Sequence, residues 1–503
     1  MAAGHPLTAE AGADVLRSGG NAVDAAIAAM LMSWVAESPL TGPGAGGFML
    51  LHTADGEDHL LDFFVAAPGK GAIGPPGELE PIEVRFSRDA VQGFHIGPAS
   101  CGVYGNPLGV ALASKRFGSL PLAELAAPAA RATRDGIEVT PMMRQFFEVL
   151  GPIITRTPEA RAVYAPGGSL IGLGETIRMP DVGDLVERLG AEGPEFLYEG
   201  DHARRVAEWV CERGGSITTE DLAGYRVIER DAARARYHGR DILTNPPPSS
   251  GGILISYSLD LMERLDPAPE DRLRTLVRVM DRTNRERTRE FVRGLHSEGY
   301  LERFLAQEAL ESAAREVSNP LGNTTHLSVL DADGTCASVT CSNGSCSGVV
   351  VPGTGLHLNN MLGEEDLNPK GHNHEPGARV PSMMAPTLVL HDGQPEIALG
   401  SAGSNRIRSA ILQTIINVVD RGRGAQEAVE APRLHYENGV VEAEEGINPE
   451  ALDELERDGW QVVRWQGKNL YFGDVQAVAR HPDSGALSGG GDPRRGGVAV
   501  VVD

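Results

Sequence analysis

Apolar positions at the start of the chain repeat with the period of an α-helix. Between Leu7 and Arg17 they recur every three or four residues, and Gly19-Gly20 supplies a left-handed stop. The next run, Ala25–Val35, is apolar on every face, so we expect a buried helix that begins at Asn21 or Asp24. Because this run is too short to cross a bilayer, no membrane partner is expected.

Later segments predict further helices, two hairpins and closing strands. We expect helices within Val103–Thr140, Asp181–Arg188, Ala203–Arg213, Glu270–Arg293, Tyr300–Val317 and Arg406–Asp420. Alternating apolar and polar positions around Asp-Gly turns predict one hairpin over 324–342 and another over 386–399. Strands are expected at 476–481 and 498–502. The stretch 318–322 is rich in turn residues, and we interpret it as an exposed candidate processing site.

The first hairpin makes a geometric prediction. With its loop centred on 332–333 or 333–334, Thr324 lies opposite a residue between 341 and 343, next to Ser342. Two hydroxyl groups are then placed side by side where an exposed segment becomes a strand. Thr is common in strands, so the pattern alone also fits two ordinary residues at a strand edge.

Glycines at 42, 44 and 47 match the G-x-G-x-x-G spacing of dinucleotide-binding loops. Such a loop follows a strand and opens a helix, whereas these glycines follow a helix and precede the strand Phe48–Leu51. We therefore favour another reason for the glycines, which is the close packing of backbone layers.

Composition narrows the classes of function. The chain has 503 residues, of which 41% are hydrophobic, and this length alone favours two to four domains. Lys and Arg number 45 against 69 Asp and Glu, and the net charge of −24 argues against a nucleic-acid partner. Five cysteines are too few for a disulfide scaffold, and no apolar leader follows Met1. We expect a cytoplasmic protein, with export left open if the start is misplaced.

A series of motifs resembles the γ-glutamyltranspeptidase family. The motifs are His5-Pro6-Leu7, GGNAVDAA at 19–26, GAGGF at 44–48, Tyr198-Glu199-Gly200, PPSSGG at 247–252, TTHLSV at 324–329, PGTG at 352–355, Asn359-Asn360, GSAG at 400–403 and DPRRGG at 492–497. They follow the family's order from residue 5 to the C-terminus, and the block at 324–329 is the most specific.

The resemblance implies an α+β protein with the N-terminal-nucleophile hydrolase fold, a four-layer αββα sandwich. The precursor would cut itself between Asn323 and Thr324. The large piece, 1–323, and the small catalytic piece, 324–503, would then stay together as a heterodimer in one body.

The same resemblance assigns the catalytic roles. The hydroxyl of Thr324 would attack the preceding carbonyl, and the α-amine freed by hydrolysis has an ordinary pKa of about 8, which suits a general base. Ser342 would orient the nucleophile by a hydrogen bond. Backbone N–H groups of Gly403 and Ser404 would form the oxyanion hole, with Ser404 replacing the family's second glycine.

The expected substrate contacts depart from the family's pattern. The arginine that holds the substrate α-carboxylate is replaced by Phe64, and an apolar ring cannot form a bidentate ion pair. Ser382 stands where the family has two serines, Asn343 is a further expected contact, and the acid that meets the substrate amine falls on Glu364 or one of the two acids after it. We therefore expect a small amide substrate whose acyl group need not be γ-glutamyl.

Two other groups of residues suggest different chemistry. Gly344-x-Cys346-x-Gly348 resembles a nucleophile elbow with a thiol, but it lacks the strand-to-helix context. His372 and His374 could hold a metal, although a solvated polar loop is the simpler interpretation. No metal or other cofactor is expected.

The sequence thus predicts an autoprocessing amidohydrolase or acyltransferase of γ-glutamyltranspeptidase type, which transfers an acyl group to water, an amino acid or a peptide. The alternative among enzymes is an acylase of the cephalosporin-acylase type. The alternative outside enzymes is a homologue without turnover that acts as a binding protein.

Overall fold

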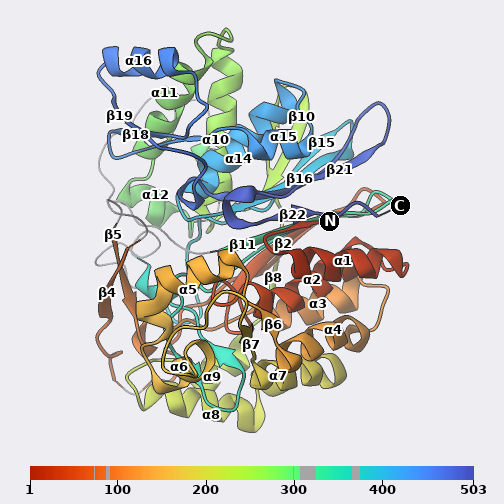
Figure 1. Cartoon of the computed structure of the whole chain (residues 1–503), viewed down its shortest axis with the longest axis vertical. Coiled ribbons are helices and arrows are strands. Elements are labelled where there is room, and N and C mark those ends of the chain that lie inside the picture. The colour runs from red at the N-terminus through yellow and green to blue at the C-terminus, as the bar shows by residue number, and fades with distance from the viewer. Residues whose placement is uncertain (73, 86–90, 298, 306–323, 365–373, 503) are drawn as a thin grey trace.

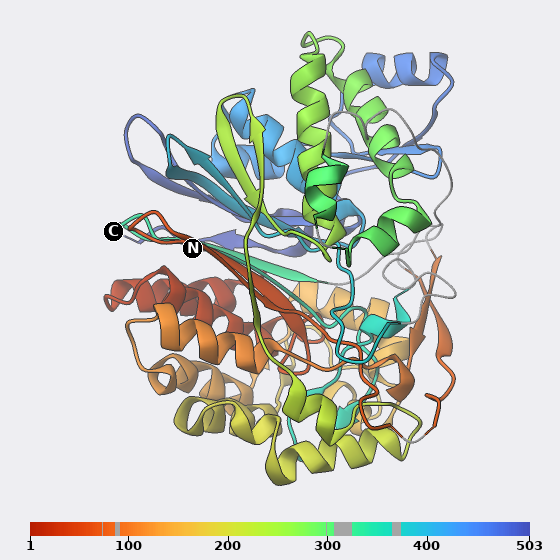
Figure 2. The ribbon, with the colours of Figure 1, turned by 180° about the vertical axis from the view of Figure 1, so that it is seen from behind.

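Two sheets lie face to face between two layers of helices (Figures 1 and 2). This computed structural model describes the chain except residues 73, 86–90, 298, 306–323, 365–373 and 503. The arrangement confirms the predicted αββα sandwich. In the first sheet, strands from early and late parts of the chain are interleaved, and the second sheet joins two strands within residues 233–244 to four strands within residues 387–490. The chain therefore forms one pair of shared sheets and not a row of separate domains.

The first sheet has seven strands in the order β22-β1-β11-β12-β2-β3-β8. Their bounds are β1 Ala2–Ala3, β2 Gly46–His52, β3 Asp58–Phe63, β8 Ile228–Arg230, β11 Thr325–Leu330, β12 Cys336–Ser342 and β22 Val498–Ala499. Every residue of β2, β11 and β12 is buried, as expected for strands that are covered on both faces.

The second sheet has six strands in the order β21-β20-β16-β15-β10-β9. Their bounds are β9 Ala233–Tyr237, β10 Arg240–Thr244, β15 Thr387–His391, β16 Gln394–Ala402, β20 Asp474–Arg480 and β21 Leu487–Gly490. The pair β15 and β16 is the second predicted hairpin, which turns at Asp392 in a left-handed conformation with a φ of 51°. Three pairs of strands lie outside the two sheets: β4 Glu80–Arg85 with β5 Val91–Ile96, β6 Ile137–Glu138 with β7 Thr176–Ile177, and β13 Val350–Val351 with β14 Leu356–His357. A further small sheet contains β17 Leu434–Glu437, β18 Val440–Ala443 and β19 Gln461–Arg464.

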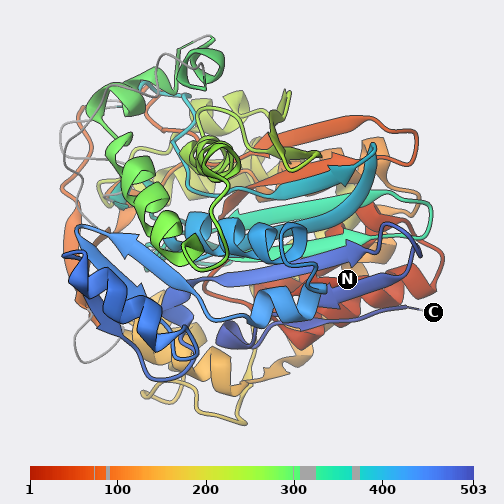
Figure 3. The same ribbon diagram turned by 90° about the horizontal axis from the view of Figure 1, so that it is seen from above.

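Helices lie on the outer face of each sheet (Figures 1 and 2), and Figure 3 looks down on those of the second sheet. On the first sheet, the helices α1 Pro6–Arg17, α2 Ala22–Ala36 and α3 Asn106–Phe117 contact the strands, and α4 Leu122–Asp135 and α7 Pro180–Glu192 pack outside α2. On the second sheet, the helices α10 Ser250–Leu265, α14 Arg406–Val419 and α15 Ala425–Glu430 contact the strands, and α11 Arg272–Arg285 packs on α10. The others are α5 Pro141–Ile154, α6 Pro158–Tyr164, α8 Gly200–Cys211, α9 Thr219–Gly224, α12 Arg289–Gly294, α13 Tyr300–Phe304 and α16 Pro449–Arg457. Of the helices that the structure describes, none is long and apolar enough to cross a membrane.

The predicted buried helix is confirmed as α2. Every residue of it is buried, and it begins with a capping box in which Asn21 and Asp24 each accept a backbone N–H from the other end of the box. The helix therefore packs between the first sheet and the outer helices, where an all-round apolar surface is stable.

The prediction of one helix over Glu270–Arg293 is wrong, because the chain forms α11 and α12 with a break between them. Thr288 adopts an extended conformation, and its hydroxyl accepts the N–H of Phe291 at 3.1 Å, which starts a new helix. Of the helix predicted over Tyr300–Val317, α13 is seen, and residues 306–317 lie outside the described part of the chain.

The glycine-rich segment before β2 serves backbone packing, as predicted. A Cβ atom on Gly44 would overlap the carbonyl oxygen of His357, and one on Gly46 would lie 2.7 Å from the amide nitrogen of Val65. The segment also follows helix α2 and leads into strand β2, whereas a dinucleotide-binding loop follows a strand and opens a helix. The structure therefore does not support a dinucleotide-binding loop here.

Candidate active site

The first hairpin brings Thr324 and Ser342 together. Strands β11 and β12 pair from Thr325 with Cys341 to Leu330 with Cys336, and this register continues to Thr324 opposite Ser342. The hydroxyl of Thr324 donates to Oγ of Ser342 at 3.4 Å, and the two residues are only 5% and 3% exposed. The predicted juxtaposition of two hydroxyl groups is therefore present.

The loop centre that we predicted for this hairpin is wrong by half a residue. The loop runs from Asp331 to Thr335, and the N–H of Asp331 donates to the carbonyl of Thr335 at 3.0 Å. The Asp331 carboxylate also accepts the N–H groups of Asp333 and Thr335, at 3.1 and 2.9 Å. This aspartate favours a loop with an odd number of residues, so the register falls midway between the two predicted ones.

Ser342 and Asn343 are held by the backbone around them. Oγ of Ser342 accepts the N–H of Gly344 at 2.9 Å, which fixes its rotamer beside Thr324. The N–H of Asn343 donates to the carbonyl of Leu40 at 2.9 Å, and the side chain is fully buried. Oδ1 of Asn343 has no hydrogen-bond partner among the described residues, so it is an acceptor that a substrate N–H could use.

Glu364 lies beyond β14 in the sequence and is buried against the loop that follows Ser342. Its Oε1 accepts both the N–H and the hydroxyl of Ser345, at 2.7 and 2.9 Å, and Ser345 in turn accepts from Asn360. The predicted residues Asn323 and His372, and the two acids after Glu364, lie outside the described residues.

Gly403 and Ser404 form a turn at the end of β16 and immediately before α14. Both have positive φ angles, 116° for Gly403 and 53° for Ser404, and their carbonyls accept the first N–H groups around the start of the helix. A serine with positive φ is unusual and is maintained here by the surrounding structure. The positive end of the α14 dipole therefore lies at this turn, which suits the stabilisation of an oxyanion.

Contacts between the two sheets place this turn at the same end of the sandwich as Thr324. The hydroxyl of Ser338 on β12 donates to the carbonyl of Leu399 on β16 at 3.0 Å. Further along both strands, the imidazole of His326, which is hydrogen-bonded to Thr340, packs so closely on Gly400 that a Cβ there would overlap it. Strands β12 and β16 therefore lead toward the same end of the sandwich, where β12 ends at Ser342 and β16 is followed by Gly403.

Phe64 and Ser382 lie in neighbouring segments two strands away from Ser342. Gly46 pairs with Ser342 on one side and has Phe64 on the other, so Phe64 lies roughly 10 Å from Ser342. The Phe64 ring is 1% exposed and stacks on Phe48 with ring centroids 5.3 Å apart. The hydroxyl of Ser382 accepts the N–H of Met384 at 3.0 Å. The position of the expected carboxylate clamp is therefore apolar and filled.

Glu37, at the end of α2, is a buried acid that the sequence analysis missed. Its carboxylate accepts the hydroxyl of Thr8 at 2.7 Å and also the hydroxyl of Thr325, the residue next to Thr324. Burial raises the pKa of Glu37 to about 7. The signal in the sequence is a lone acid that follows an otherwise apolar helix.

The thiol alternative is not supported. Cys346 is fully buried, and burial raises the pKa of its thiol far above the ordinary range, so the nucleophilic thiolate does not form at neutral pH. His374 lies beside the ring of His296 at a centroid distance of 6.4 Å.

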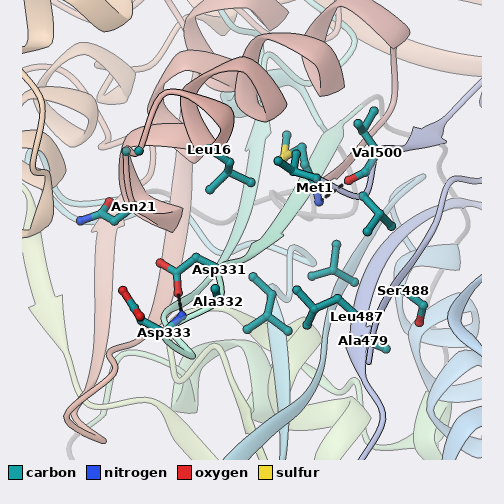
Figure 4. A pocket seen from close by; sticks show the side chains of 16 residues that line it. Met1, Leu16, Asn21, Asp331, Ala332, Asp333, Ala479, Leu487, Ser488 and Val500 are labelled. Carbon is teal, nitrogen blue, oxygen red and sulfur yellow. Dashed lines mark hydrogen bonds between the residues drawn. The ribbon is translucent and has the colours of Figure 1, made fainter. Parts of the chain in front are cut away.

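A separate pocket of about 340 Å³ lies near the hairpin loop of β11, lined by Met1, Leu16 and Asp331 among others (Figure 4). Thr324 and this loop are at opposite ends of β11, roughly 20 Å apart. This pocket is therefore distinct from the candidate active site.

A sandwich of this kind, with a threonine that begins a central strand, is the arrangement of the N-terminal-nucleophile hydrolases. The solved structure of cephalosporin acylase from Bacillus halodurans superposes on this chain with a TM-score of 0.82 at 26% identity, and the match covers 99% of this chain and 94% of that one. Residues 8–502 match the model of the family described as Gamma-glutamyltranspeptidase, and the chain belongs to that family.

Relatives of this chain carry different names, among them acylase and glutathione hydrolase. Acylase ACY 1 proenzyme of Pseudomonas sp. (strain V22) is 34% identical over 99% of this chain and 92% of that protein. Glutathione hydrolase proenzyme of Escherichia coli (strain K12) is 29% identical over 96% of this chain and 88% of that protein. Both of these relatives are named as proenzymes.

Proposed function

We propose that this chain cuts itself between Asn323 and Thr324 and then works through an acyl-enzyme on Thr324. The observation that carries the proposal is the buried hydroxyl pair of Thr324 and Ser342 at the head of β11. In the first step the Thr324 hydroxyl attacks the carbonyl of Asn323, its proton passes to the departing amine, and an ester replaces the amide. The α-amine of Thr324 is free once the ester has formed, and water then hydrolyses the ester, which releases the carboxylate of Asn323 and restores the hydroxyl of Thr324.

The freed amine acts as the base in turnover. It takes the proton of the Thr324 hydroxyl as the oxygen attacks the substrate carbonyl, and it returns the proton to the leaving amine. The N–H groups of Gly403 and Ser404, at the start of α14, hold the oxyanion of the tetrahedral intermediate. Water or an amino acid then attacks the ester and releases the acyl group. Asn343, in the loop after β12, and Glu364, which packs on that loop, are proposed to contact the substrate.

We further propose that the substrate is an amide of acylase type and that its acyl group need not be γ-glutamyl. Two relatives named acylases support this, one at 34% identity and the other with a matching fold. Phe64 supports it as well, because an apolar ring in place of an arginine removes a charge-paired contact that can contribute about 2–5 kcal/mol.

A denaturing gel and a substrate panel test the proposal. Purified protein should give two bands, for residues 1–323 and 324–503, and Thr324→Ala should give one uncut band without activity. Turnover of γ-glutamyl-p-nitroanilide is then compared with glutaryl and simple acyl anilides. Exclusive use of the γ-glutamyl compound would contradict the acylase assignment. A single wild-type band, with no labelling of Thr324 by an electrophilic glutamine analogue, would favour a homologue that only binds.

A further inference from the structure

A cavity of about 330 Å³ lies in the layer of helices outside the first sheet. It is enclosed by the end of α2, by α6 and α7, and by the pair β13 and β14, in the lower half of Figure 1. Most of its wall is apolar, with Trp34, Val163, Met179 and Val182 as the main side chains. An apolar cavity of this size with a few polar groups is typical of a site for a small organic molecule.

One side of the cavity carries neutral hydrogen-bonding groups. The hydroxyl of Tyr164 lies 2.5 Å from Oγ of Ser38 and 3.3 Å from Nδ1 of His357, and all three residues line the cavity. Burial lowers the pKa of His357 to about 4, so its imidazole is uncharged at neutral pH. This side therefore offers polar contacts without a charge.

Three residues of the wall also have a buried polar atom without a hydrogen-bond partner among the described residues. These atoms are Nε1 of Trp34, Oγ1 of Thr41 and Nε2 of His357. Trp34 and Thr41 are only 1% and 2% exposed. Unsatisfied groups of this kind are rare in folded proteins, and a bound molecule with a hydroxyl or amide group would give them partners.

The charged residues of the cavity lie toward solvent. Arg178 and Asp181 are exposed, and Glu159 is half-buried. The carboxylate of Asp181 already accepts the N–H of Gly353 at 3.2 Å. One cation beside two acids gives no net attraction for an anion, and solvent weakens each of these charges. The cavity is therefore suited to an uncharged molecule.

The cavity shares a wall with the candidate active site. Four residues of the segment 38–43 line the cavity, and the carbonyl of Leu40 in the same segment accepts the N–H of Asn343 at 2.9 Å. On the other side of the cavity, the carbonyl of His357 accepts from Nδ2 of Asn343 at 3.4 Å. A molecule in the cavity would thus contact both of the segments that hold the residue after Ser342.

We propose that this cavity is an effector site for a small uncharged molecule with an aromatic or branched hydrocarbon body and one hydroxyl or amide group. The bound molecule packs on the segment 38–43, shifts the position of Asn343 and so changes the rate of turnover. The binding does not depend on the proposed function, whereas the change in turnover rests on it.

Fluorine NMR with three probes tests the binding and its chemistry. 4-Fluorophenol is uncharged at pH 7, and its Kd for the wild type should be on the order of 1 mM or lower. 4-Fluorobenzoate carries a charge and 4-fluorotoluene lacks the hydroxyl, so each should bind at least ~5-fold more weakly. The comparison of the three probes needs no variant.

Two tryptophan variants locate the bound probe. Ala162 is an exposed residue of α6 that lines the cavity, so Ala162→Trp places a large ring at its mouth and should weaken binding of 4-fluorophenol at least ~10-fold. Ala191 is exposed near the far end of α7, and Ala191→Trp is the matched control that should bind as the wild type does. Melting temperatures establish that both variants fold.

Turnover of the best anilide substrate tests the effector role. Saturating 4-fluorophenol should change kcat/KM at least ~2-fold in the wild type and in Ala191→Trp, and should have no effect on Ala162→Trp. Binding without any change in turnover would overturn the effector role.

Other results would overturn the site itself. These are a lack of saturable binding, equal binding by both variants, and tighter binding of 4-fluorobenzoate or 4-fluorotoluene. Competitive inhibition that persists in Ala162→Trp would place the probe in the active site and would also refute the inference. Binding that Ala162→Trp weakens, in a protein that turns over no anilide, would instead refute the proposed function and leave the binding site standing.

Discussion

Glu37 gives a quantitative prediction about stability and pH. The perturbation is Glu37→Gln in a Thr324→Ala background, so that both proteins stay in one piece. The carboxylate is buried and accepts hydroxyl groups from Thr8 and Thr325, and no cation forms an ion pair with it in the part of the chain that the structure describes. Gln keeps the size and the acceptor oxygen but cannot ionise.

The sign and size of the effect follow from the pKa of Glu37. Burial raises it from 4.5 to about 7 in the folded protein. The neutral acid therefore favours folding fully below pH 4.5, and this contribution is lost as the pH rises through 7, because the unfolded chain ionises first. A rise of this size corresponds to about 3 kcal/mol of unfolding free energy.

The assay is the melting temperature of both proteins between pH 4.5 and 8. For 503 residues, 3 kcal/mol is roughly 3 °C, so the Gln variant should gain about that much relative to its parent as the pH rises. The pKa of Asp474 is also raised, in part by the charge of Glu37, so removing that charge adds to the gain of the Gln variant in the same direction. A difference in melting temperature that stays constant over this pH range would refute the reasoning.

Three further predictions concern the site and its supports. Ser342→Ala should lower kcat about tenfold with little change in KM, because one orienting hydrogen bond is lost; an unchanged kcat in anilide turnover would contradict this role. Gly44→Ala should lower the melting temperature or prevent folding, since its Cβ would overlap His357, whereas Gly424→Ala, with nothing within 4 Å, should fold normally. Iodoacetamide should alkylate the exposed Cys211 and leave Cys346 intact, as mass spectrometry of the folded protein can show.

Elements whose signals are local were predictable from the sequence. Helix α2 follows from an apolar run behind the Asn21 and Asp24 capping box, and the hairpins follow from strand alternation around Asp-Gly turns. Errors arose where one side chain redirects the backbone. Thr288 starts a new helix inside a continuous helical pattern, and Asp331 selects an odd loop that shifts the register by half a residue.

The same contrast holds for the candidate site. Thr324 and Ser342 belong to one hairpin, so their juxtaposition could be worked out from residue spacing. Glu37 meets Thr325 from 288 residues away. This contact depends on how α2 packs against the first sheet, and no periodicity within a segment encodes that packing.

The alternation of early and late strands in the first sheet has a consequence for the life of the processed enzyme. β1 lies between β22 and β11, and β12 lies beside β2, so a cut before Thr324 breaks one covalent bond and none of these ladders. The pieces remain interlocked while folded. Once denatured, however, they must find each other by diffusion, and recovery becomes a second-order process that slows on dilution. If the proposed cleavage takes place, the lifetime of the two-piece protein is thus set by how fast it unfolds.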